Sequence, residues 1–280
     1  MPSPNAPPLD TELAEAVLVR FLRSELHRTG LRKLVLGLSG GIDSAVAGLL
    51  AARAVGPENL VALALPSAES SPQSLEDARA VAAAGGFELG VVPIGDAAAG
   101  LIPQLGADDV PVTPLRRGNV MARLRMIVLY DVSARVSGLV VGTSNKTELL
   151  LGYGTLHGDM ASALNPLGDL YKRQVRDLAR HLGVPAAVID KPPTADLWTG
   201  QTDESEMGFS YDEADAVLFQ LVELRRSEQD VVAAGFPAAL VRTIVSKMVR
   251  SQFKRRPPVI AKLSQRTIGW EFRYPRDWMT

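Results

Sequence analysis

The sequence predicts an α/β fold, namely a doubly wound, mainly parallel sheet with helices on both faces. Short apolar segments of strand length alternate along the chain with longer segments that have helical apolar spacing. This alternation is typical of parallel strands joined by helical crossovers. In addition, a Gly-Gly turn directly follows the first apolar segment. Open α/β sheets bind their ligands at that end of the strands.

The predicted elements follow in order from these spacings. A first helix is expected over residues 10–29, because Leu13, Val17 and Phe21 share one face and Gly30 ends the pattern. Strands are expected at 33–38, 60–65, 88–93 and 139–142. Further helices are expected at about 43–55, 71–84, 94–104, 115–135, 145–151, 172–182, 211–225, 228–234 and 237–252.

Two segments lack periodicity. Residues 153–171 are dense in Gly, Asn, Asp and Pro and are expected to form an ordered functional loop, and residues 190–210 are expected to be irregular. No repeat or low-complexity linker divides the chain. Residues 1–280 are therefore expected to form a single domain with a helical C-terminal portion from about residue 211.

Composition excludes several classes of protein. Charged residues make up 22% and the formal net charge is −1, so no strong field draws the chain to nucleic acid. Charges interrupt every apolar run before it reaches membrane-spanning length, and the first residues lack the features of a signal peptide. We therefore expect a cytoplasmic protein that binds neither nucleic acid nor membrane. The absence of cysteine excludes disulfides, zinc-thiolate sites and a cysteine nucleophile in this chain.

The glycine turn after the first predicted strand has the features of a phosphate site. Backbone N–H groups converge at the start of the following helix, where the helix dipole adds about half a positive charge. Glycines let the backbone approach a phosphate closely, and serine hydroxyls can donate to it. The predicted loop consists of Gly37, Leu38, Ser39, Gly40, Gly41, Ile42, Asp43 and Ser44.

Asp43 within this loop needs an explanation, because a carboxylate repels a phosphate. A divalent cation between the two removes the conflict, since Mg²⁺ binds carboxylate and phosphate oxygens together. The alternative is a Ser/Asp cap on the helix that follows the turn. The loop is neither a P-loop, which needs Gly-Lys-Ser/Thr, nor a dinucleotide G-x-G-x-x-G fingerprint.

A second polar segment, residues 142–148, follows the last predicted strand and begins a helix. Thr143 could meet a nucleotide there, and Glu148 could supply a second carboxylate for Mg²⁺. The alternative is an N-terminal capping box in which Thr or Ser caps the helix and the glutamate closes the box.

The long helix predicted over 115–135 carries Asn119, Arg123 and Arg125. The two arginines lie two positions apart and therefore diverge around the helix. We expect them to act differently, one in a buried salt bridge and the other as a planar clamp on an anionic ligand.

The first loop resembles the SGG-x-DS pyrophosphate loop of the ATP pyrophosphatases, and the motifs that follow resemble those of the NAD synthetase family. Matching segments extend in order from about residue 30 to residue 260. After the loop they are residues 118–126, 142–148, 165–172, 193–198, 201–204, 208–212 and 254–258.

This resemblance implies an ATP pyrophosphatase fold and a homodimer with the dinucleotide at its interface. It implies a ligase that uses ATP and Mg²⁺ to join ammonia to the carboxylate of deamido-NAD, through an acyl adenylate and with release of pyrophosphate and AMP. Loop residues 37–44, Thr143, Lys172 and Thr194 would bind ATP, and Asp43 and Glu148 would bind Mg²⁺. The substrate-binding residues predicted with it are Arg123, Asn119, Phe253 and Lys254.

The predicted catalytic residues are Asp43, Lys172, Asp203 and Glu204. Lys172 would neutralise charge on the departing pyrophosphate, and Asp203 or Glu204 is our hypothesis for the group that holds and deprotonates ammonium. Glutamine-dependent members of the family carry a glutaminase domain with a cysteine nucleophile, whereas this chain has no cysteine. Free ammonia is therefore the expected donor, although a separate glutaminase chain could supply it.

The chain departs from the family pattern at three positions. Leu156 stands where many members have lysine, Ala163 where aspartate is frequent, and Phe253 where histidine is found. These changes affect the expected dinucleotide contacts and leave the ATP side intact. The alternatives are another ATP pyrophosphatase-type amidotransferase, a tRNA-modifying enzyme, or a non-catalytic nucleotide-binding module. Arg255 and Arg256 are expected in a solvated basic tail.

Overall fold

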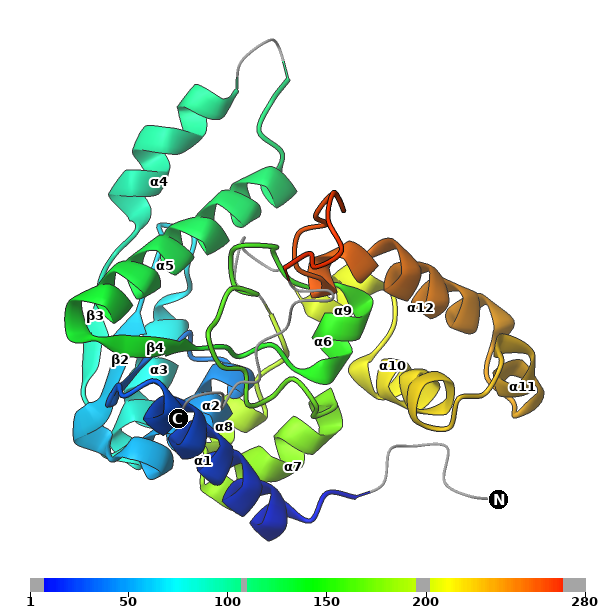
Figure 1. Cartoon of the computed structure of the whole chain (residues 1–280), viewed down its shortest axis with the longest axis horizontal. Helices are drawn as coiled ribbons and strands as arrows, with labels where there is room; N and C mark the ends of the chain where they lie inside the picture. The colour runs from blue at the N-terminus through cyan, green and yellow to red at the C-terminus, as the bar shows by residue number, and fades with distance from the viewer. Residues whose placement is uncertain (1–7, 107–109, 195–201, 269–280) are drawn as a thin grey trace.

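A parallel sheet lies in the left half of the molecule as Figure 1 shows it, and the C-terminal helices lie to its right. The computed structural model describes residues 8–106, 110–194 and 202–268. Within them the strands lie in the order β3-β2-β1-β4. In the register of the sheet, Leu34 of β1 lies opposite Leu60 of β2 and Leu139 of β4. The strands are β1 (Lys33–Gly37), β2 (Leu60–Ala64), β3 (Leu89–Val91) and β4 (Gly138–Val141).

Helices surround this sheet and continue beyond it to the C-terminus. The first group is α1 (Thr11–Arg28), α2 (Ile42–Val55), α3 (Pro72–Gly85), α4 (Gly95–Leu101), α5 (Pro114–Val136), α6 (Lys146–Leu151) and α7 (Lys172–Leu182). The second group is α8 (Ala186–Ile189), α9 (Asp203–Met207), α10 (Tyr211–Leu218), α11 (Glu228–Ala233) and α12 (Ala238–Arg250).

Side chains of the central strand β1 pack into two separate cores, because successive residues of a strand point to opposite faces of the sheet. Leu34 and Leu36 belong to a buried cluster with residues of α1, α2, α3 and α7. Val35, between them, belongs to a cluster with residues of α4 and α5. Helices therefore cover both faces of the sheet, as the sequence predicts.

A third cluster forms the helical C-terminal portion. Tyr211, Leu218, Val231 and Ile244 pack together from α10, α11 and α12, and Leu151 of α6 joins them. This contact attaches the C-terminal helices to the segment that follows β4. The helix α6 therefore links the C-terminal portion to the carboxyl edge of the sheet.

The observed elements differ from the predicted ones mainly where they are short. The helices α8 and α9 have four and five residues, too few for a helical period to be visible in the sequence. The helix expected over 211–225 is α-helical to Leu218 and continues as a π-helix over Phe219–Glu223. Within the described parts of the chain, no helix is both long and apolar enough to cross a membrane.

Candidate active site

The Gly-Gly turn joins β1 to α2 at the carboxyl end of the sheet. Gly40 has a φ of +80°, and a Cβ there would lie 2.1 Å from the carbonyl oxygen of Ser74. Only glycine fits such a position without strain. The Ser44 hydroxyl donates to the Gly41 carbonyl (2.9 Å) and accepts from the Ser39 N–H (3.2 Å). These contacts hold the turn at a helix N-terminus, a favourable place for an anion.

Asp43 does not act as the cap of α2, the alternative that the sequence left open. Gly41 is the N-cap residue, without a side-chain cap bond. The Asp43 carboxylate accepts from Asn145 Nδ2 (2.9 Å) and forms an ion pair with Lys172 Nζ. Lys172 Nζ also lies 3.3 Å from Glu148 Oε1. One ammonium therefore bridges two carboxylates that follow the neighbouring strands β1 and β4.

Burial shifts the pKa values of this cluster. Burial raises the pKa of Glu148 to about 8, and the charge of Asp43 raises it too. Burial would lower the pKa of Lys172, but the charges of Asp43 and Glu148 outweigh it and hold that pKa above its usual value. Two carboxylates share one ammonium here, so the cluster can accept further positive charge.

Glu148 also serves the capping box that the sequence allowed. Asn145 Oδ1 accepts from the Glu148 N–H (3.0 Å), and Glu148 Oε2 accepts from the Asn145 N–H (3.3 Å). The other oxygen, Oε1, faces Lys172. Both interpretations of this segment are therefore compatible, with Asn145 as the cap residue in place of the expected Thr or Ser.

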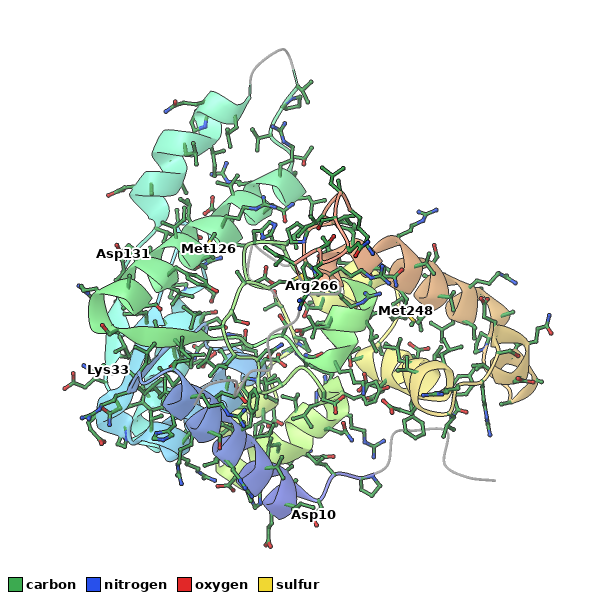
Figure 2. The ribbon with its side chains drawn as sticks, in the orientation of Figure 1. Asp10, Lys33, Met126, Asp131, Met248 and Arg266 are labelled. Carbon is green, nitrogen blue, oxygen red and sulfur yellow. The ribbon has the colours of Figure 1, made fainter. Side chains whose placement is uncertain are left out.

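A cavity of about 500 Å³ opens beside the glycine turn. Met126 of α5, labelled in Figure 2, contributes to its wall. The carboxyl ends of the strands, α5 and α9 therefore all contribute residues to the wall of this cavity. The predicted site residues on the wall are Gly37, Leu38, Ser39, Gly41, Ile42, Asp43, Ser44, Asn119, Thr143, Glu148, Lys172, Thr194, Asp203 and Lys254.

The two arginines of α5 have different partners, as predicted, and the buried salt bridge expected for one of them stays a prediction. Arg125 is partly buried, lies on the cavity wall and donates to the Leu65 carbonyl (3.0 Å). Arg123 is exposed and donates to the Leu156 carbonyl at 3.1 and 3.3 Å. Arg123 therefore ties α5 to the loop that begins at residue 153. Its contact with a dinucleotide stays a prediction.

An acidic group lies on the cavity wall near α9. The two carboxylate oxygens of Asp203 accept from the hydroxyls of Tyr211 (2.9 Å) and Tyr153 (3.0 Å). Burial raises the pKa of Asp203. The other candidate for the ammonium role, Glu204, accepts from the Tyr211 N–H (2.9 Å) at the start of α10. Of these two carboxylates, Asp203 is the one on the cavity wall.

Glu206, Tyr153 and Asp159 are among the polar residues on the wall that were not identified from the sequence. Glu206 Oε2 accepts from the Tyr153 hydroxyl (2.9 Å), and Asp159 accepts from the Thr155 N–H (2.7 Å). Tyr153 and Asp159 fall in the loop that was expected to be functional, but its irregular sequence does not indicate which side chains point inward. Glu206 lies on α9, which is too short for its helical spacing to be recognised in the sequence.

Two predicted residues near the C-terminus are placed differently from each other. Lys254 Nζ donates to the carbonyls of Gly152 (2.8 Å) and Gly154 (2.7 Å). Burial lowers the pKa of Lys254. Phe253 has 62% of its surface exposed and faces a separate groove along α12. Residues 195–201 of the predicted motifs lie outside the described residues.

The prediction of a solvated basic tail is wrong for Arg255. Its guanidinium donates to the carbonyls of Leu149 and Leu150 (both 2.9 Å) and of Met248 (2.8 Å). These carbonyls belong to the last turns of α6 and α12, where helices leave acceptors unpaired. Arg255 therefore joins two helix ends.

The donor set near the turn fits a metal held together with a substrate. Among residues 8–106, 110–194 and 202–268, no group of three or more His, Asp or Glu side chains is placed to hold a metal ion. Asp43 and Glu148 nevertheless offer two carboxylates around one cation. Mg²⁺ typically takes one or two carboxylates and completes its shell with substrate phosphates and water.

The fold and the site together define a nucleotide-binding α/β protein, with an anion loop after β1 and a lysine–carboxylate cluster beside it. Comparison with known proteins specifies the family. Residues 14–258 match the model of the NAD synthase family. The chain belongs to this family.

Individual relatives agree with the assignment and with the predicted fold class. An NH(3)-dependent NAD(+) synthetase from Trichlorobacter lovleyi is 55% identical over 273 residues, which is 96% of this chain and 97% of the relative. The solved NH3-dependent NAD synthetase from Campylobacter jejuni has a TM-score of 0.77 at 33% identity, over 91% of this chain and 100% of that one. The NMN synthetase from Francisella tularensis has a TM-score of 0.80 at 32% identity, over 90% and 99%.

Proposed function

We propose that this chain is a ligase that amidates deamido-NAD to NAD with ammonia and ATP, through an acyl adenylate and with release of AMP and pyrophosphate. The observation that carries the proposal is the Lys172 bridge between Asp43 and Glu148, set beside an anion loop. Its substrate is inferred from curated relatives that are 53% and 55% identical and are named NH(3)-dependent NAD(+) synthetases.

In the first step a carboxylate of the substrate attacks the α-phosphate of ATP. The protein's part is positioning and charge neutralisation, because phosphoryl chemistry of this kind needs little covalent help. The N–H groups of the turn would hold the phosphates, and Lys172 would exchange a carboxylate partner for the departing pyrophosphate. Thr143 and Thr194, both on the wall, would contact the nucleotide.

We infer that Mg²⁺ accompanies the triphosphate, held by Asp43 and Glu148. Burial, together with the charge of Asp43, raises the pKa of Glu148, so a second cation beside these carboxylates would be favourable, which supports the inference. When bound, the ion would neutralise charge on the phosphate oxygens.

In the second step ammonia displaces AMP, and the incoming nitrogen must lose a proton. We propose Asp203 as the group that holds ammonium and takes the proton. Its burial and raised pKa bring a carboxylate closer to the range useful for a base. The neighbouring Tyr153 and Glu206 would complete a polar pocket.

We infer a cytoplasmic homodimer with deamido-NAD at the interface, contacted by Arg123 and Lys254. The support for the dimer is the exposed surface of α5, where Ile127 and Tyr130 lie one helical turn apart and are 56% and 39% exposed. Apolar side chains gathered on one helix are typical of an association surface. Sedimentation equilibrium of the purified protein tests the dimer.

A pyrophosphate-release assay tests the proposed activity. Release should require deamido-NAD and produce NAD with an ammonium salt, whereas glutamine alone should give no NAD. Robust turnover with glutamine would contradict ammonia as the direct donor. Absence of NAD formation with all substrates present would refute the assignment and favour another ATP pyrophosphatase-type activity.

The structural similarity to an NMN synthetase favours one second candidate, which is amidation of nicotinic acid mononucleotide. Leu156 and Ala163 lack the polar groups expected to contact the dinucleotide. The same assay decides between the two acids when each is offered alone and in competition. We expect deamido-NAD to give the higher kcat/KM.

A further inference from the structure

We propose that Asp215 and Thr147 form a positioning pair that sets where Lys172 lies between Asp43 and Glu148. Neither residue of the pair lines the cavity, and on the proposed function neither touches a substrate. The inference rests on the proposed function, in which Lys172 contacts the phosphates of ATP. It assigns Asp215 and Thr147 a part in the reaction that neither their sequence motif nor the capping patterns of α6 and α10 suggests.

The contacts form a chain from α10 to the site. Asp215 of α10 is 3% exposed, and its Oδ1 accepts from the Thr147 hydroxyl. The Thr147 oxygen in turn accepts from the Lys172 N–H (3.1 Å). The other oxygen of Asp215, Oδ2, accepts from the Arg173 N–H (2.9 Å). The first two N–H groups of α7 are therefore held by side chains from two other helices.

These hydrogen bonds fix the backbone beside two charged residues of the site, Lys172 and Glu148. Lys172 is the first residue of α7, and Glu148 directly follows Thr147 on α6. One hydroxyl thus joins the backbone that carries the ammonium to the backbone that carries a carboxylate. At this helix start Gln174 Oε1 accepts from the Tyr171 N–H (3.0 Å), whereas the N–H groups of Lys172 and Arg173 are held from outside by Thr147 and Asp215.

The burial of the pair makes the link stiff. Thr147 is fully buried and Asp215 nearly so, and both oxygens of Asp215 have donors. A buried, satisfied polar network holds one geometry, because any displacement leaves a polar atom unpaired. Displacement of the start of α7 would move Lys172 relative to both carboxylates, and small displacements of a positioned group cost large factors in rate.

The test compares Thr147→Val, which keeps the shape and removes the hydroxyl, with Thr147→Ser, which keeps the hydroxyl. The matched control is Ser227→Ala, which removes the Ser227 cap of α11, remote from the site. Calorimetric titration with ATP and Mg²⁺ and steady-state kinetics of NAD formation are measured on the full chain, well below each melting temperature.

We expect Thr147→Val to lower kcat by about 10- to 100-fold and to weaken ATP binding, with KM for deamido-NAD unchanged. Thr147→Ser should stay within about twofold of wild type, and Ser227→Ala should lower the melting temperature by about 2–4 °C without kinetic change. Asp215→Asn, which cannot accept from both donors, should follow Thr147→Val.

Two outcomes would overturn the positioning role. One is a Thr147→Val enzyme that binds ATP and turns over like Ser227→Ala, since the link would then be only a cap. The other is an equal loss in Thr147→Ser and Thr147→Val, which would show that the hydroxyl is not the cause. Failure of wild type to form NAD would instead refute the proposed function, and ATP binding by the same variants would still decide the positioning role.

Discussion

Replacement of Gly40 by alanine should damage the Gly-Gly turn between β1 and α2, whereas the same change at Gly41 should not. Gly40 has a φ of +80°, and an added Cβ would meet the Ser74 carbonyl at 2.1 Å. Gly41 has a φ of −92°, and its added Cβ would meet only Ser39 Oγ, at 3.4 Å. The two neighbours therefore differ in backbone conformation and in space.

The expected cost at Gly40 has two parts. A left-handed conformation costs an alanine about 1–2 kcal/mol relative to glycine, and the displacement of packed backbone adds about 1–3 kcal/mol. The free energy of unfolding should fall by about 2–5 kcal/mol, or about 4–10 °C in melting temperature for a chain of this size. Gly41→Ala should change the free energy of unfolding by no more than about 1 kcal/mol in either direction.

Urea unfolding and calorimetric titration with ATP and Mg²⁺ check this prediction. Gly40→Ala should also bind ATP at least about tenfold more weakly, because the turn must move away from α3 and carry its N–H groups with it. If Gly40→Ala unfolds and binds ATP like wild type, the close approach to Ser74 does not constrain the loop and the reasoning fails.

Three further predictions concern the charged groups. Lys172→Met should lower kcat for NAD formation by about 10²–10³-fold. An unchanged kcat would show that Lys172 takes no part in the chemical step. Asp203→Asn should raise the ammonium concentration needed for half-maximal rate and lower the rate by about 10²-fold. Glu204→Gln should affect stability alone. Equal ammonium dependence in both variants would contradict the assignment of Asp203. Burial raises the pKa of Asp215 to about 6 from 3.8, so the native state binds this proton more tightly and the contribution of Asp215 to the unfolding free energy should fall by up to about 3 kcal/mol as pH rises from 4 to 6. Asp215→Asn should therefore show a decrease that is smaller than that of wild type by this amount, while Glu148 still contributes and the exposed control Asp131→Asn follows wild type. Urea unfolding at each pH measures it, and a profile of Asp215→Asn parallel to wild type would show that Asp215 does not contribute.

The sheet and its ligand-binding edge could be predicted from the sequence because they depend on local patterns. Apolar runs give the strands, and the turn at Gly40 and Gly41 has the chemistry of an anion site whatever surrounds it. Lys172 could be named only through the family resemblance. Its position between Asp43 and Glu148 depends on contacts 129 and 24 residues apart in the chain, which no local pattern records.

Tertiary contacts likewise decide which side of a short element faces the cavity. Asp203 and Glu204 are neighbours in sequence with the same chemistry, but the Tyr211 side chain binds the first and its backbone N–H binds the second. In the same way, Arg255 resembles a solvated cation until the ends of α6 and α12 are placed beside it. Sequence patterns identify such groups without indicating which partner each will meet.

The two oxygens of Glu148 perform separate tasks, and this limits how that position can change. An aspartate is one methylene shorter, so it could preserve the helix start or the reach toward Lys172, but not both. A glutamine could close the capping box with its single acceptor oxygen, but its NH₂ group would then face the Lys172 ammonium, which is also a donor. One side chain therefore serves both the start of α6 and the charge beside Lys172, and a redesign of that charge must also rebuild the beginning of α6.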